Sequence, residues 1–72
     1  MDYRQVVAHN VRAFRQERVW SQEELAHRAG VHRTYISQVE RAVTNPTVTV
    51  IAKIAHALGV EPAALLELPK GH

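Results

Sequence analysis

The chain has 72 residues, of which 46% are hydrophobic and 22% are charged, and its formal net charge is +2. This length allows one domain and excludes enzyme scaffolds such as barrels and doubly wound sheets. Because the chain contains no cysteine, neither a disulfide nor a thiolate zinc site supports its small core, and we expect self-association to do so. No signal peptide or membrane-spanning run is recognisable, so we expect a cytoplasmic protein without membrane contact.

The first two helices are predicted from apolar spacing and capping residues. The second spans residues 21–29, where Ser21 and Glu24 form a capping box and Gly30 supplies a left-handed stop. The first spans residues 3–18, where apolar side chains recur every three or four residues along one face, at Tyr3, Val7, Val11 and Phe14.

Three further helices are predicted at residues 32–41, 47–58 and 61–68. Residues 48–50 alternate in the manner of a β-strand, but the helical spacing that follows outweighs this pattern and no partner strand is available. Pro62 begins the last helix and Pro69 ends it. The predicted fold class is therefore all-α, with five helices in one domain.

The second and third helices are joined by only three or four residues around Gly30. So short a connection makes the two axes cross steeply, as in a helix-turn-helix that places its second helix in the DNA major groove. Ile36 and Val39 face inward from the third helix. Its outer face carries no acidic residue and consists of Arg33, Thr34, Ser37, Gln38 and Arg41. Arginine suits guanine edges and glutamine suits adenine edges, so this face predicts DNA binding.

Residues 4–68 resemble the Cro/repressor-type (Xre-type) helix-turn-helix DNA-binding proteins. The short length and the run from Arg33 to Ser37 are most similar to the small controller proteins of restriction–modification systems, with phage or plasmid repressors as the alternative. The resemblance implies one lambda-repressor-like domain over residues 1–72 and a transcriptional regulator of double-stranded DNA without a cofactor. The stretches that carry it are Ser21–Ala26, Ala29–Val31, Arg33–Arg41, Asn45–Thr47 and Lys53–Val60.

The resemblance also implies roles for individual residues. The residues expected to face base edges are His32, Arg33, Thr34, Ser37 and Gln38. Those expected near phosphates are Gln22, Tyr35, Arg41, Thr44 and Asn45. Arg15 and Glu40 match an ion pair that ties the first helix to the end of the recognition helix. The alternatives are that the polar residues form a solvated surface and that Tyr35 packs on the core edge.

Two residues depart from the family pattern. His32 stands where a serine or similar cap is common, and because histidine caps poorly, we expect either a looser helix start or a direct DNA contact. Ala42 stands where glycine is common. Alanine resists the left-handed conformation by about 1 kcal/mol, which favours a third helix that runs on past its expected end.

The C-terminal segment, residues 60–72, has more apolar side chains than are needed to cover one edge of the monomer core. We expect a homodimer through Val60, Ala64, Leu65 and Leu68, which suits a near-palindromic operator; a monomer with these side chains internal is the alternative. A different class of function, a protein-interaction module such as an antitoxin or adaptor, remains open.

The remaining chemistry-bearing residues predict neither catalysis nor a metal site. Five histidines are present, at positions 9, 27, 32, 56 and 72, but none pairs with another at metal-binding helical spacing. No nucleophile motif surrounds Ser21 or Ser37. We therefore expect no enzyme activity, no cofactor and no small-molecule ligand.

Overall fold

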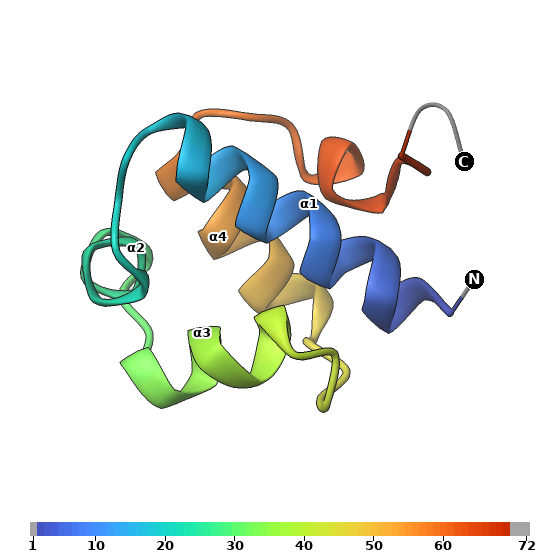
Figure 1. The fold of residues 1–72 in the computed structure, drawn as a ribbon, viewed down its shortest axis with the longest axis horizontal. Coiled ribbons are helices and arrows are strands. Elements are labelled where there is room, and N and C mark those ends of the chain that lie inside the picture. Colours follow the sequence, from blue (N-terminus) through green and yellow to red (C-terminus); the bar gives the residue numbers. More distant parts are fainter. Residues whose placement is uncertain (1, 70–72) are drawn as a thin grey trace.

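The computed structural model describes residues 2–69 as four α-helices followed by a short 3-10 helix (Figure 1). Within these residues no strand occurs, so the all-helical prediction is confirmed, and residues 48–50 form the first turn of a helix. Met1 and residues 70–72, which include part of the predicted dimer segment and His72, lie outside the described residues. The elements are α1 (Tyr3–Glu17), α2 (Gln22–Ala29), α3 (Arg33–Glu40), α4 (Val48–Leu58) and the 3-10 helix η1 (Pro62–Leu66).

The fifth predicted helix, residues 61–68, is wrong in both type and length. The structure has a five-residue 3-10 helix there, in which the Ala64 N–H donates to the Glu61 carbonyl at 2.9 Å. No side chain caps its start. A segment this short does not repay the cost of nucleating an α-helix, and the 3-10 form is common in such pieces.

Polar caps fix where three of the α-helices begin, and the one at Ser21 is the cap that the sequence predicts. Asp2, Ser21 and Thr47 accept hydrogen bonds from the backbone N–H groups of Arg4, Glu24 and Val50, at 2.7, 3.0 and 3.2 Å. Gly30 and Gly59 end α2 and α4 in the left-handed conformation, with φ of 71° and 74°. These boundaries set the short turn before α3.

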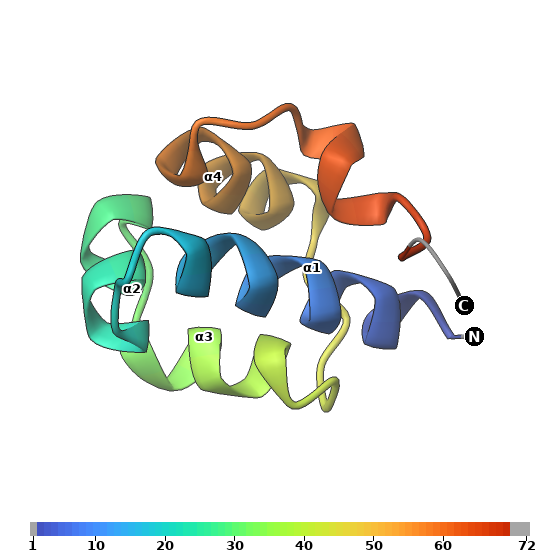
Figure 2. The same ribbon diagram turned by 45° about the horizontal axis from the view of Figure 1, so that its top comes forward.

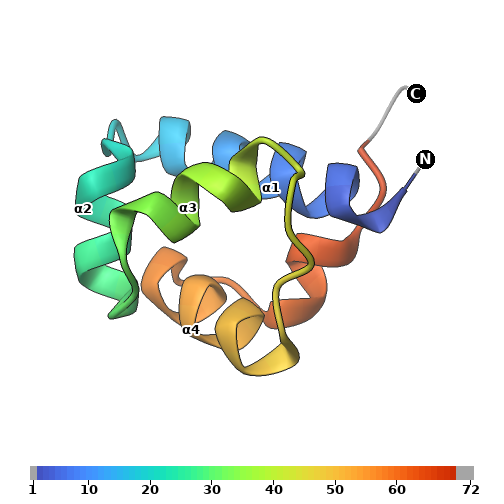
Figure 3. The same cartoon turned by 90° about the horizontal axis from the view of Figure 1, so that it is seen from below.

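The core lies where α1, α3 and α4 face one another, with α2 across one end and η1 at the other (Figures 2 and 3). Fully burying a Leu or Ile side chain contributes about 1.5–3 kcal/mol, so these contacts position the α2–α3 unit firmly. The buried cluster contains Val7, Val11, Leu25, Ala26, Ala29, Ile36, Val39, Ile54, Ala55, Leu58 and Leu65.

The expectation that the third helix runs on past Ala42 is wrong. α3 ends at Glu40, and Ala42 takes the left-handed conformation with φ of 60°. The strain of about 1–2 kcal/mol is offset by hydrogen bonds that close the helix end. The Ala42 N–H donates to the Val39 carbonyl at 3.1 Å, and the Val43 N–H donates to the Gln38 carbonyl at 3.1 Å.

Candidate nucleic-acid interface

A tight turn of Gly30, Val31 and His32 connects α2 to α3. The Val31 N–H donates to the Ala26 carbonyl at 3.0 Å, which closes the turn directly on the end of α2. In Figure 1 the view runs along α2 while α3 lies across the page, so the two helices cross steeply. Ile36 and Val39 are buried, which leaves the opposite face of α3 at the surface.

The outer face of α3 brings together the residues predicted to face base edges. His32, Arg33 and Thr34 are exposed, and Ser37 and Gln38 are partly exposed. A shallow depression on this surface is lined by Gln22, Arg33, Thr34 and Ser37. The start of α2 therefore adjoins the outer face of α3, and the only acidic residue of α3, Glu40, is buried.

His32 caps α3 in place of the common serine, and the expectation of a poor cap is wrong. Its Nδ1 accepts a hydrogen bond from the Thr34 backbone N–H at 3.1 Å, while its backbone is extended. An imidazole nitrogen can take the acceptor role of a serine oxygen as long as it carries no proton.

An ion pair between Arg15 and Glu40 joins α1 to the end of α3. Arg15 Nε donates to Glu40 Oε2 at 2.7 Å and Arg15 Nη2 donates to Oε1 at 2.9 Å. The side chains are 14% and 3% exposed. The hydrogen bond to Glu40 raises the pKa of Arg15 above its ordinary value. Both charges are therefore paired in a protected site.

Gln22, the first residue of α2, belongs to the same network. Its Nε2 donates to Glu40 Oε1 at 3.0 Å. The amide is thus held by the end of α3, where one of its N–H groups is occupied and the other is available to a ligand.

Arg12 was missed by sequence reasoning. Its Nη2 donates to the Glu40 backbone carbonyl at 2.6 Å, which satisfies a carbonyl at the end of α3. The signal in the sequence was the spacing of three between Arg12 and Arg15, which puts both guanidinium groups on one side of α1.

The other residues predicted near phosphates are more scattered. Tyr35 is half-buried and packs against the core. Arg41 and Asn45 are exposed and Thr44 is half-buried. Within the described residues, the side chains of Arg41, Thr44 and Asn45, which follow α3, make no hydrogen bond to the protein.

The predicted dimer residues divide into surface and core. Leu65 is 0% exposed, so its side chain lies in the monomer core and cannot contribute to a dimer surface. Leu68 is 52% exposed, and Val60 and Ala64 are half-buried. Leu66, which the sequence analysis did not single out, is 42% exposed.

Asn10 anchors this C-terminal segment to α1. The Asn10 side chain is buried and its Nδ2 donates to the carbonyls of Leu65 and Glu67, at 2.9 and 2.8 Å. Both donors of the amide are used, so η1 is held in one position on α1.

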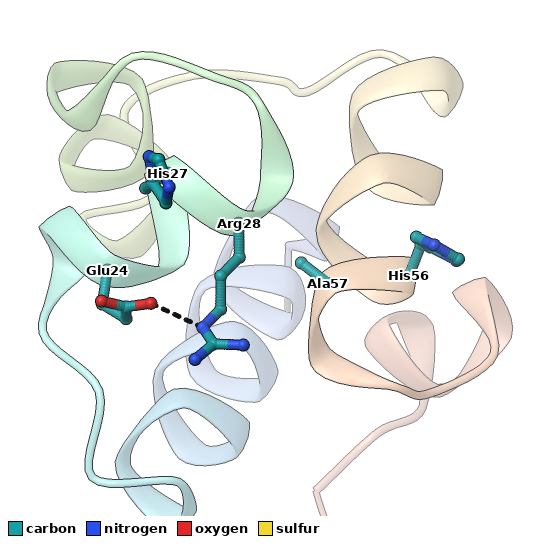
Figure 4. A pocket seen from close by; sticks show the side chains of 5 residues that line it. All are labelled: Glu24, His27, Arg28, His56 and Ala57. Atoms are coloured by element: carbon teal, nitrogen blue, oxygen red, sulfur yellow. Dashed lines mark hydrogen bonds and ion pairs between the residues drawn. The ribbon is translucent and has the colours of Figure 1, made fainter.

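A second hollow lies between α2 and α4. Arg28 pairs with Glu24 at 2.6 Å and stacks on the Trp20 ring at 4.2 Å from its centroid. His27 and His56 line the same hollow but lie on different sides of Arg28 (Figure 4). Within residues 2–69, no three His, Cys, Asp or Glu side chains come together as a metal site.

The comparisons with known proteins agree with this geometry. The helix-turn-helix family HTH_3 matches residues 11–65. The chain is 49% identical over 69 residues to a hypothetical transcription factor of Neisseria meningitidis, which covers 96% of this chain and 65% of that protein. It is 42% identical over 66 residues to Control protein C.SmaI of Serratia marcescens, which covers 92% of this chain and 79% of that protein. The chain thus spans less than two thirds of the length of the Neisseria relative.

Solved structures of relatives have the same fold. The crystal structure of the Neisseria factor matches with a TM-score of 0.93, covering 96% of this chain and 79% of that chain at 49% identity. The regulator SinR in complex with DNA matches with a TM-score of 0.80, covering 85% and 98% at 34% identity. In the described part of the chain, every helix is too short or too polar to span a membrane. The chain belongs to the Xre-type helix-turn-helix family of DNA-binding transcriptional regulators.

Proposed function

We propose that this chain binds a specific double-stranded operator as a homodimer and regulates transcription, with α3 of each subunit in the major groove of one half-site. The observation that carries the proposal is the exposed, acid-free outer face of α3 beside Gln22 at the start of α2. A helix of this kind fits the major groove, and its first residues are those that contact base edges.

Base recognition falls to the outer face of α3. Arg33 is exposed and suits the O6 and N7 atoms of guanine, and Gln38 suits the N6 and N7 atoms of adenine. The other side chains proposed to face bases are His32, Thr34 and Ser37. Those proposed to position the backbone through phosphates are Gln22, Tyr35, Arg41, Thr44 and Asn45.

The distribution of charge supports the same interface. Residues 1–41 contain seven Lys or Arg and five Asp or Glu, while residues 42–72 contain two of each. The basic excess thus lies in the part of the chain that carries the helix-turn-helix. Contacts between arginines and phosphates release counterions, so affinity should fall steeply with salt.

Dimerisation through the C-terminal segment supports a two-fold site. Leu66 and Leu68 leave apolar surface exposed on the segment that Asn10 fixes to α1. A dimer would place two recognition helices about 34 Å apart, one DNA turn, so that each meets one half of a near-palindrome.

The test is binding to the DNA upstream of the chain's own gene, followed by footprinting. We expect protection of an inverted repeat, with weaker binding to random duplex that falls further with salt. Failure to bind either duplex at low salt would overturn the proposal. It would favour the alternative of a protein-interaction module, since one solved structure of the relative SinR is a complex with the SinI protein.

A further inference from the structure

We propose that His32 uses its two ring nitrogens for different tasks. Nδ1 caps the recognition helix, and the N–H of Nε2 donates a hydrogen bond to an acceptor on a base edge. The inference rests on the proposed function, because it assumes that α3 enters the major groove. It adds which partner donates the hydrogen bond, and therefore which bases His32 can contact.

The cap fixes where the imidazole carries its proton. Nδ1 accepts from the Thr34 backbone N–H at 3.1 Å, so it cannot itself hold a hydrogen. A neutral imidazole has one protonated and one unprotonated nitrogen. The hydrogen bond made by one nitrogen therefore selects the tautomer, and the proton of His32 lies on Nε2.

The Nε2 group is free to meet a ligand. His32 is exposed, and within residues 2–69 its side chain makes no other hydrogen bond. Its neighbours Arg33 and Thr34 line the depression on the outer face of α3. Because Nε2 lies across the ring from the capping nitrogen, its N–H points away from the start of the helix. A serine cap would use its oxygen on the helix, and its O–H donor would lie beside the cap, short of the position that Nε2 reaches.

A lone donor distinguishes the bases by their acceptors. Guanine presents N7 and O6 in the major groove, adenine presents N7 and thymine presents O4. Cytosine presents the N4 amino group, which is a donor, so an N–H pointed at it meets no acceptor. His32 should therefore disfavour cytosine at one position of each half-site and tolerate the other three bases.

The tautomer is tested on the free protein by nitrogen-15 NMR of the histidine rings, at a pH where they are neutral. We expect His32 to be protonated on Nε2 alone. The reference is His27, which is exposed and makes no side-chain hydrogen bond in the described residues, so both of its tautomers should be populated. A His32 ring protonated on Nδ1 would overturn the inference without any bearing on DNA binding.

The contact is tested by selecting duplexes from a random pool with the wild-type chain and with His32→Ser, which keeps a capping oxygen but is too short to carry a donor to the position of Nε2. The wild type should disfavour cytosine at one position by about tenfold, the value of one net hydrogen bond, and His32→Ser should lose that preference. His27→Ser is the matched control, since His27 lines the hollow between α2 and α4 (Figure 4), and it should select as the wild type does.

The outcomes separate this inference from the proposed function. If His32→Ser selects the same sequences as the wild type, or weakens binding equally for all sequences as a lost phosphate contact would, the inference fails while the operator model stands. If the wild type selects no sequence at all, the proposed function fails, and the base contact of His32 fails with it.

Discussion

Arg15 and Glu40 lie 25 residues apart in the chain and form a two-point ion pair, which joins the last turn of α1 to the end of α3. The carboxylate of Glu40 also accepts from Gln22. One buried acidic group therefore fixes α1, the start of α2 and the end of α3 together. The pair is structural in itself, but it sets the spacing between the two parts of the proposed DNA surface.

Removal of the Glu40 carboxylate should destabilise the protein strongly. We expect Glu40→Ala to lower the free energy of unfolding by about 3–5 kcal/mol, because Arg15 would keep a largely buried charge without its partner. The matched control is Glu24→Ala, whose partner Arg28 is exposed; it should cost under about 1 kcal/mol. Urea unfolding of the two variants measures the difference, and equal losses would contradict the role given to burial.

The sequence was sufficient for the parts of the fold that depend on local signals. Capping residues and apolar spacing predicted the four α-helices to within a few residues, because each signal acts within one or two turns. The type of the last helix was not predictable in this way. η1 is held by Asn10 from the other end of the chain, a contact that no local pattern encodes.

The errors at His32 and Ala42 have a common cause. Both predictions applied the average preference of a residue type to a position where the surrounding hydrogen bonds decide the conformation. His32 caps α3 because a neutral imidazole supplies an acceptor. Ala42 adopts a positive φ because the backbone hydrogen bonds at the end of α3 require it. Average preferences of about 1 kcal/mol are readily overcome by such contacts.

Ala42→Gly should stabilise the protein. Ala42 has a φ of 60°, which costs an L-residue about 1–2 kcal/mol, and glycine relieves this strain at the price of a more flexible unfolded chain. We expect a net gain of about 1 kcal/mol in the free energy of unfolding.

The control for this substitution is Ala52→Gly, at an exposed position inside α4. The same chemical change there should destabilise by about 1 kcal/mol, because glycine is a poor residue for a helix interior. Chemical denaturation of both variants gives the two signs. A loss of stability in Ala42→Gly as well would show that the left-handed turn carries no strain.

Arg33→Ala should change which DNA is bound, not only how tightly. Loss of a two-point contact to guanine should cost about 1–3 kcal/mol on the operator and relax the preference at one base pair. Arg41→Ala is the comparison, since Arg41 is proposed to contact a phosphate. It should weaken operator and random duplex alike and reduce the salt dependence by about one counterion.

Fluorescence anisotropy on both duplexes over a salt series measures these effects. If Arg33→Ala weakens operator and random DNA by the same factor, the base contact assigned to Arg33 is wrong.

Leu65 and Leu68 should respond differently to substitution, although they lie only three residues apart. Leu65→Ala should lower the free energy of unfolding by about 2–5 kcal/mol, because the side chain is 0% exposed and a cavity would remain in the monomer core. Leu68 is 52% exposed, so Leu68→Asp should leave the monomer folded and place a charge in the proposed interface.

Sedimentation equilibrium and urea unfolding distinguish the two effects. We expect Leu68→Asp to shift the protein toward monomer and to weaken binding to a two-half-site operator much more than to a single half-site, since the two half-sites are linked only through the dimer. A Leu68→Asp variant that remains as dimeric as the wild type would move the interface away from the C-terminal segment. In that case Leu66, which is 42% exposed, would also lie outside the interface.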